Sequence, residues 1–267
     1  MANATDRVKQ VVQPKGGYVP IKLVKELRIK DDTPLISREN IKPWIVGLAV
    51  DYLTRLMLGT DKNEVFKMSI TGSYNFLELY HYSDPARHGT SFYNIRRFYS
   101  NIRKENYLSD ISIYCTCNLV SYDVCYREVP YWFNGTEVRP DKQTINNIRQ
   151  MVLRSLDFLK IFGPVVKHGF HFGGGYTETI DKAEGDYLTK DTLWDFKVLN
   201  TFPNNANRLQ VLVYYLMGKE SNREEFKSIN KLGIYNPRFN AVYLINTLDI
   251  NEDTMEDVKK NVIGYEG

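Results

Sequence analysis

Cysteine is scarce in this chain of 267 residues, and long apolar runs are absent. The three cysteines, Cys115, Cys117 and Cys125, lie close together in the sequence, which gives no disulfide framework and favours a reducing compartment. The first residues, MANATDRVKQVVQPKGG, contain no apolar stretch of signal-peptide length, and no run reaches transmembrane length. We therefore expect a cytoplasmic protein without a membrane partner.

A strong excess of charge is also missing, because the net charge is only +3. This value permits a polyanionic partner but does not indicate one. The sequence has no G-x-x-x-x-G-K-[ST] motif, so any motor activity would have to come from a separate partner. The hydrophobic content of 43% and the charged content of 25% are ordinary for a globular protein with a sizeable core.

The spacing of apolar residues indicates where helices and strands alternate. Helices are expected where apolar residues recur every three or four positions: 41–58, 61–106 with breaks, 144–162, 207–217, 221–231 and 253–261. Strands are expected where β-forming residues dominate: 110–132, 184–190, 192–199 and 242–246. Strands embedded among helices indicate a mixed α/β fold with a central sheet.

Two of the expected strands carry charged residues among apolar neighbours. Asp195 and Lys197 are two positions apart, so both lie on one strand face while Phe196 points to the other. A hairpin through residues 189–191 would bring Asp186 beside Asp195. Two carboxylates make an oxygen-rich site for Mg²⁺ or Mn²⁺, and the lysine can stabilise a phosphate or help to deprotonate a metal-bound water. A surface ion pair across two strands would leave a similar pattern.

The order and spacing of these residues resemble the PD-(D/E)XK nuclease superfamily, within it the branch of RecB-type and Cas4-type nucleases. Gly185-Asp186 resembles the first catalytic aspartate of the family, and Asp195-Phe196-Lys197 resembles its (D/E)-x-K motif. Gln210 and Tyr214, four apart on an expected helix, resemble the Q-x-x-x-Y motif of the branch. The resemblance implies a restriction-endonuclease-like core, a central mixed sheet flanked by helices. It also implies catalytic roles for Asp186, Asp195, Lys197, Gln210 and Tyr214.

The same branch has an upstream helix with a G-x-x-x-(H/E) pattern that ends in a further metal ligand. The segment 47–51 resembles this pattern and puts Asp51 in the ligand position, next to Asp186 and Asp195 in the implied metal set. Aspartate is shorter than the usual histidine or glutamate. An ion pair with Arg55, four positions on, explains Asp51 equally well.

Some relatives of this branch hold an iron–sulfur cluster on four cysteines that bracket the nuclease core. Here three cysteines precede the expected core and none follows it, so we expect no iron–sulfur cluster. On a strand, Cys115 and Cys117 would share one face as small core residues.

A basic and aromatic segment, Ser91–Glu105, is a second candidate for function. Its aromatic residues alternate with basic ones, a pattern that suits stacking on bases and contact with a phosphate backbone. The candidate nucleic-acid-binding residues are Arg96, Arg97, Arg103 and Lys104. An amphipathic helix with aromatics toward the core and arginines toward water fits the pattern better.

Together these patterns predict one domain over residues 1–267, with an upstream helix at 41–59, a helix-rich insertion or subdomain at 60–165 and a catalytic core at 166–250. The predicted function is an Mg²⁺- or Mn²⁺-dependent deoxyribonuclease. The alternative is a catalytically silent nuclease-fold module that holds nucleic acid or a protein partner. DNA of unknown strandedness is the expected partner, and a homodimer or a separate motor or defence partner is compatible with the pattern.

Overall fold

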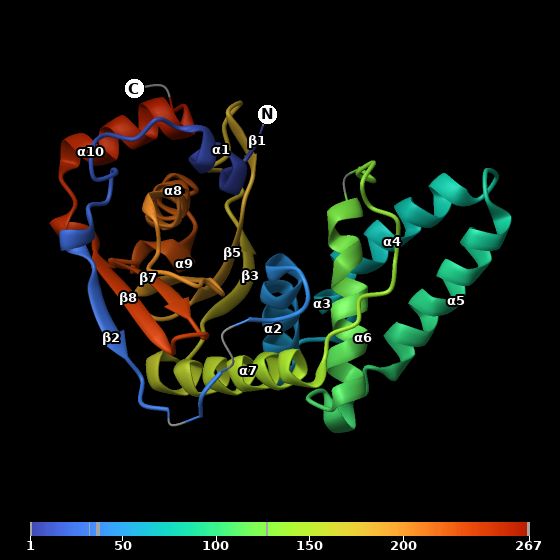
Figure 1. The fold of residues 1–267 in the computed structure, drawn as a ribbon. Coiled ribbons are helices and arrows are strands. Elements are labelled where there is room, and N and C mark those ends of the chain that lie inside the picture. Colours follow the sequence, from blue (N-terminus) through green and yellow to red (C-terminus); the bar gives the residue numbers. More distant parts are fainter. Residues whose placement is uncertain (1, 32, 36–37, 127, 266–267) are drawn as a thin grey trace. The chain divides into compact units, whose positions relative to one another are not determined.

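The computed structural model of the protein divides into two units, which Figure 1 colours along the sequence. The sheet unit comprises Met1–Asp31 with Asp157–Gly267, and the helical unit comprises Asp32–Leu156. The structure describes residues 2–31, 33–35, 38–126 and 128–265. Asp186, Asp195 and Lys197 belong to the sheet unit, whereas Asp51 and the basic segment 91–105 belong to the helical unit.

The sheet unit is built on a six-stranded sheet with the order β2-β8-β7-β6-β5-β3. The strands are β2 (Lys25–Arg28), β3 (Lys167–His171), β5 (Glu184–Leu188), β6 (Thr192–Phe196), β7 (Lys231–Asn236) and β8 (Ala241–Asn246). β6 and β7 run parallel, and the other neighbouring strands run antiparallel. A separate parallel pair joins β1 (Ala2–Asn3) to β4 (Ile180–Lys182). The predicted α/β class with a mixed sheet is therefore confirmed.

Helices cover the two faces of this sheet. α8 (Asn205–Glu220) packs on one face, and α1 (Ala4–Gln10) and η5 (Val258–Ile263) pack on α8 in turn (Figure 1). The end of α7 (Lys142–Phe162) covers the other face, where the Phe158 ring stacks 4.1 Å from Tyr235. The short helices η1 (Ile21–Leu23), α9 (Glu224–Lys227), η4 (Thr247–Asp249) and α10 (Glu252–Asp257) complete the unit.

The predicted hairpin of strands 184–190 and 192–199 is confirmed, with both strands shorter than expected, since β5 ends at Leu188 and β6 at Phe196. β5 and β6 pair antiparallel, with Tyr187 opposite Trp194 and Leu188 opposite Leu193. The turn closes where the Thr189 backbone N–H donates to the Thr192 carbonyl at 3.0 Å, and the Trp194 indole donates to the Thr189 hydroxyl at 3.0 Å. Leu193 packs with α8, and Trp194 packs with the end of α7. Successive side chains of β6 therefore point to opposite faces of the sheet, as expected.

The strands predicted over 110–132 are wrong, because this segment forms α6 (Asp110–Val120) and η3 (Ser121–Cys125). The Ser109 side chain accepts from the Ser112 backbone N–H and caps the helix. Eight of the 11 α6 residues are buried, so apolar and β-branched side chains occur on most sides of the helix and mask the helical period. Cys115 and Cys117 consequently lie on a buried helix, not on one face of a strand.

The helix predicted over 221–231 is also wrong in extent. Only α9 is helical there, and Lys231 already begins β7. All residues of β7 after Lys231 are buried, since β6 and β8 flank the strand and helices cover the sheet. A strand buried on both faces has no alternating pattern to reveal it.

The helical unit contains α2 (Pro43–Met57), α3 (Lys62–Val65), α4 (Lys67–Tyr80), α5 (Pro85–Asn101), η2 (Lys104–Asn106), α6, η3 and most of α7. The predicted helices over 41–58, 61–106 and 144–162 are thus confirmed. α6 packs against α2, α4 and α5 and forms the centre of the unit. Within the part of the chain that the structure describes, no helix is both long and apolar enough to span a bilayer.

Candidate active site

Asp186, Asp195 and Lys197 come together on the face of the sheet that α8 covers. Continuing the β5–β6 register by one position puts Asp186 opposite Asp195. Asp195 is two residues from Leu193, which belongs to the core beneath α8, so its side chain points to that face. Lys197 is two residues after Asp195, so its side chain points to the same face. Its backbone N–H donates to the Tyr235 carbonyl at 2.9 Å and extends the β6–β7 ladder.

Asp195 is a buried carboxylate, with only 2% of its surface exposed. Its Oδ1 lies 3.0 Å from the Lys197 ammonium nitrogen. Its Oδ2 is also buried and has no hydrogen-bond partner among the described residues. Burial raises the pKa of Asp195, and the charge and hydrogen bond of Lys197 oppose this without cancelling it. One oxygen of the carboxylate therefore lacks the donor or cation that a buried anion requires.

Lys197 is held in its ammonium form. Burial alone lowers the pKa of its amine, but the charge of Asp195, the Tyr214 phenol and the charge of Asp186 together raise it above the ordinary value. About a quarter of the side chain is exposed, whereas Asp195 beside it is almost fully buried. Lys197 is thus a positive charge fixed beside a buried carboxylate.

Asp186 is fixed by the backbone of the opposite strand. Its Oδ2 accepts the Phe196 N–H at 2.6 Å, in the position where the β5–β6 ladder ends. The preceding residue must be small, because a Cβ on Gly185 would lie 2.3 Å from the Phe170 ring. Beyond Lys197, the Asn236 side chain accepts from the Leu199 N–H at 3.3 Å and donates to the Leu199 carbonyl at 2.9 Å. These bonds hold both ends of the site in place.

Gln210 and Tyr214 lie on α8, buried toward this site. The Gln210 amide donates to the Tyr214 hydroxyl at 2.7 Å. Burial raises the pKa of Tyr214 to about 12 against the lowering effects of Lys197 and of its hydrogen bonds, so its phenol is neutral near pH 7. The influence of Lys197 and Asp195 on this phenol shows that Tyr214 is their neighbour. The predicted pairing of both residues on one helix face is confirmed.

Thr5 is a neighbour of the site that sequence reasoning did not find. The Gln210 amide donates to the Thr5 hydroxyl at 3.0 Å, and Thr5 belongs to α1, which packs on α8. The two residues are 205 positions apart in the sequence. No local pattern marks Thr5, so only the packing of α1 reveals it.

The pair of carboxylates fits a small divalent cation. Carboxylate oxygens are the ligands that Mg²⁺ and Mn²⁺ prefer, and the Oδ2 of Asp195, which has no hydrogen-bond partner among the described residues, is one such oxygen. The described residues hold no group of three His, Cys, Asp or Glu side chains placed to bind a metal. Mg²⁺ commonly takes only one or two carboxylates in sites where phosphate and water complete its shell, so Asp186 and Asp195 are the residues that could hold it.

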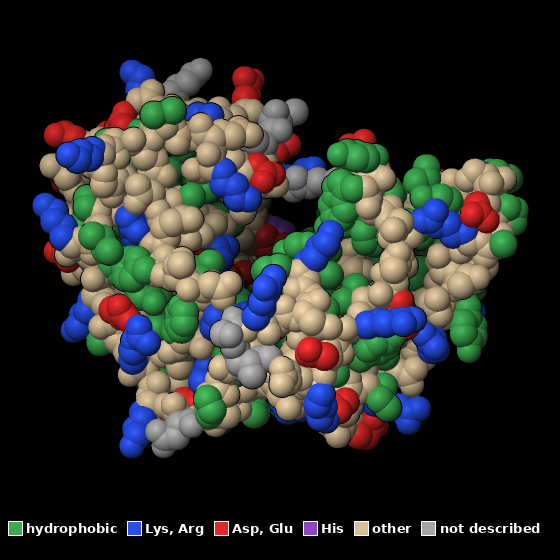
Figure 2. Space-filling model, viewed as in Figure 1, with side chains coloured by type: hydrophobic (Ala, Val, Ile, Leu, Met, Phe, Trp, Pro, Cys, Tyr) green, Lys and Arg blue, Asp and Glu red, His purple; other side chains and the backbone are tan. Residues whose placement is uncertain are grey.

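The other predicted site residues lie in the helical unit. Asp51, on α2, forms the alternative ion pair with Arg55, at 3.8 Å between Oδ2 and Nη1, and its role as a metal ligand stays a prediction. Arg96 and Arg97 lie on α5, and Arg103 and Lys104 follow that helix. On the face drawn in Figure 2, hydrophobic and basic side chains lie next to one another over the region of α4 and α5, with a few acidic side chains among them.

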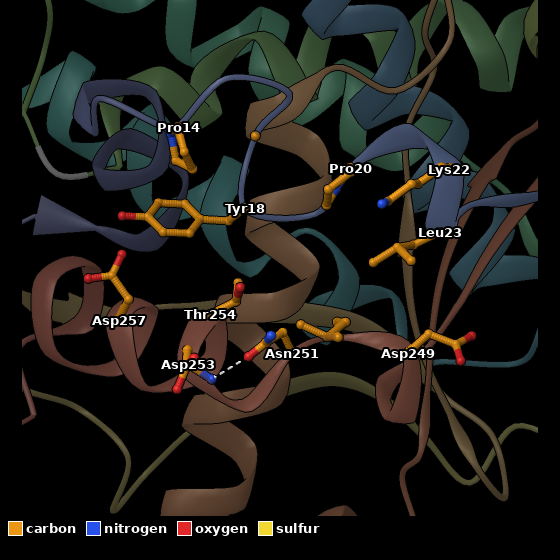
Figure 3. Close-up of a pocket in the computed structure, with 12 residues that line it drawn as sticks. Pro14, Tyr18, Pro20, Lys22, Leu23, Asp249, Asn251, Asp253, Thr254 and Asp257 are labelled. Carbon is orange, nitrogen blue, oxygen red and sulfur yellow. Dashed lines mark hydrogen bonds between the residues drawn. The ribbon is translucent and has the colours of Figure 1, made fainter.

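A separate pocket of the sheet unit lies between the N-terminal segment and α10 (Figure 3). Tyr18 and Leu23 line one side and Asp253 and Asp257 the other, and the Asp253 N–H donates to the Asn251 side chain at 2.7 Å. None of the predicted catalytic residues lines this pocket.

No family model, curated protein or solved structure matches the chain.

Proposed function

We propose that the protein is a metal-dependent nuclease that hydrolyses phosphodiester bonds in DNA, with a restriction-endonuclease-like core of the PD-(D/E)XK type. The observation that carries this proposal is the environment of Asp195. One oxygen of this buried carboxylate binds Lys197, and the other is buried without a hydrogen-bond partner among the described residues. A buried carboxylate oxygen without a partner is costly in free energy. Binding of a cation beside it removes this cost and is therefore strongly favourable.

The substrate explains why a lysine stands beside the two acids. A phosphodiester is an anion with a poor leaving group, so its attack requires positive charge near the phosphate oxygens. Asp186 and Asp195 would hold Mg²⁺ or Mn²⁺, which when bound polarises the phosphate and lowers the pKa of a coordinated water. Lys197 supplies a second, permanent positive charge, since its neighbours hold it as an ammonium ion.

The remaining residues act by positioning. Asp186 keeps its orientation because the Phe196 N–H occupies one of its oxygens. The Gln210 amide joins Tyr214 to Thr5 and thereby fixes the phenol that neighbours Lys197. This network limits how far the ammonium group can move, and a fixed charge stabilises a transition state better than a mobile one.

Incubation of purified protein with labelled single-stranded and duplex DNA, in Mg²⁺, Mn²⁺ or EDTA, tests the proposal. We expect cleavage that needs the metal and is lost in Lys197→Ala. Lys231→Ala is the matched control, because Lys231 forms its own ion pair with Asp191 at 2.7 Å on the same sheet, and this variant should cut normally. Cleavage that persists in EDTA or in Lys197→Ala would contradict the proposal. So would a folded wild type that cuts neither substrate, which would favour the silent binding module.

A further inference from the structure

Helix α5 and the turn before it expose more aromatic surface than a solvent-facing helix requires. α5 buries only Ile95 and Phe98. Phe92 and Tyr93 remain 41% and 67% exposed, and Tyr82 in the turn is 91% exposed. Single exposed apolar residues are normal, but a group of them marks a binding surface. The expectation that the aromatic residues of this helix face the core holds for Phe98 and fails for Phe92 and Tyr93.

Exposed aromatic rings are also concentrated in one unit. Among the described residues, the exposed Phe, Tyr and Trp side chains are Tyr74, Tyr82, Phe92, Tyr93, Tyr126, Tyr131, Trp132 and Phe239. All except Phe239 belong to the helical unit. The sheet unit covers its many aromatic residues, so the exposure is a property of the helical unit and not of the composition of the whole chain.

The rings near the α4–α5 turn form a continuous row. Ring centroids are 4.5 Å apart between Tyr82 and His81 and 5.0 Å apart between His81 and His88, both in edge-to-face contact. The His88 and Phe92 centroids are 6.4 Å apart, and these two rings are stacked. The Arg96 guanidinium follows, 5.5 Å from the Phe92 ring. His88, Phe92 and Arg96 are four positions apart and therefore share one face of α5.

Positive charge dominates helix α5 and the residues after it. Residues 85–104 contain five Lys or Arg side chains and no Asp or Glu, whereas Asp84 caps the start of α5 between Tyr82 and His88. Arg97 is partly neutralised by Glu137, 3.3 Å away. No ion pair forms at Arg96, Arg103 or Lys104 within the part of the chain that the structure describes. The surface therefore offers flat rings and unneutralised cations side by side.

We propose that this surface, formed by Tyr82, His88, Phe92, Tyr93 and Arg96, binds single-stranded DNA by stacking bases on its rings. Cations that track the backbone and rings that stack on bases are the two parts of a single-strand site. A duplex stacks its bases on one another, so their flat faces are closed to these rings. The choice of DNA rests on the proposed nuclease function, and the preference for a single strand rests on the exposed rings.

Fluorescence anisotropy with the full-length protein tests this proposal in EDTA, where binding is separated from metal-dependent cleavage. The probes are a labelled dT 20-mer, a duplex of the same length and a 20-mer of abasic sites, which keeps the phosphates but lacks bases. We expect the dT strand to bind most tightly. Phe92→Ala and Tyr93→Ala should each weaken its binding roughly 5- to 100-fold. Both side chains are exposed, so their loss should leave the melting temperature unchanged.

Two further variants separate stacking from charge. Arg96→Ala should lower the slope of log K against log salt by about 0.7, while Tyr93→Ala leaves the slope unchanged. Tyr131→Ala is the matched control, because Tyr131 is fully exposed in the same unit but outside this surface, and it should bind normally.

Equal binding of the duplex or of the abasic strand would overturn the proposal. Unchanged binding in both Phe92→Ala and Tyr93→Ala would do the same and would favour a protein partner for the exposed rings. Binding in EDTA and cleavage in Mn²⁺ distinguish the two proposals. A wild type that binds the dT strand in EDTA but does not cut it in Mn²⁺ would contradict only the nuclease function. A wild type that cuts DNA while Phe92→Ala and Tyr93→Ala bind the dT strand normally would overturn only this surface.

Discussion

Asp195→Asn is the substitution whose effect the structure defines most closely. The wild-type carboxylate has a raised pKa, because burial outweighs the attraction of Lys197. At pH values between 3.8, the pKa of this carboxyl in the unfolded chain, and the raised pKa in the folded protein, only the folded protein keeps the proton. The contribution of Asp195 to the free energy of unfolding is thus fully present below pH 3.8 and is lost as pH rises through the folded pKa. Asparagine does not titrate, so the free energy of unfolding of the variant lacks this pH-dependent loss.

The expected result has two parts. In EDTA, the stability of the variant relative to the wild type should increase with pH across this window. Saturation with Mn²⁺ at 100 times the dissociation constant should stabilise the wild type by about 2.7 kcal/mol, because the ion binds only the folded state. For a domain of this size that corresponds to an increase in melting temperature of about 5–10 °C. The variant should show little or none of this increase.

Thermal melts between pH 4.5 and 8, with EDTA or Mn²⁺, measure both parts. Asp191→Asn is a suitable control, since Asp191 is a partly exposed turn residue with a lowered pKa and an ion pair to Lys231. An equal Mn²⁺ shift in Asp195→Asn would show that the ion binds elsewhere. A wild type that gains stability over the variant as pH rises would show that the folded protein favours the Asp195 anion, contrary to the reasoning.

Three other substitutions test the surroundings of the site. Thr5→Val should lower the cleavage rate with a change in melting temperature of no more than a few degrees, because it frees the Gln210 amide without opening a cavity; an unchanged rate would make Thr5 a packing residue only. Gln210→Ala should reduce activity more than stability, and unchanged turnover with a large drop in melting temperature would contradict its positioning role. Gly185→Ala should destabilise the fold by about 1–3 kcal/mol in urea melts, because its Cβ would overlap the buried Phe170 ring; a stability equal to the wild type would refute that account.

The parts of the fold that were predicted correctly have local signals. The β5–β6 hairpin shows apolar residues around a short polar turn, and the two-residue period then places Asp195 and Lys197 on one face. Gln210 and Tyr214 share a helix face for the corresponding reason, a spacing of four on α8. The Asp51–Arg55 ion pair also follows from this spacing.

The elements that were predicted wrongly lie where burial on several sides removes the regular spacing of apolar residues. α6 is buried on most sides, so its β-branched residues resemble those of a strand. β7 lies between two strands and is buried on both faces after Lys231, so it lacks the alternation of a half-buried strand. Contacts between segments far apart in the sequence could not be predicted either. Thr5 reaches Gln210 only because α1 packs on α8, and the exposure of Phe92 and Tyr93 depends on which face of α5 meets its neighbours.

The initial rate of DNA cleavage in Mn²⁺ by two isosteric variants, Asp195→Asn and Asp191→Asn, tests whether Asp195 belongs to the metal site of a nuclease. Both replace an ion-paired aspartate of the same hairpin region, but of the two only Asp195 has a buried oxygen without a hydrogen-bond partner among the described residues. We predict that Asp195→Asn loses cleavage while remaining folded, and that Asp191→Asn cuts at the wild-type rate. Equal rates for Asp195→Asn and the wild type would contradict the assignment of this site as a nuclease centre.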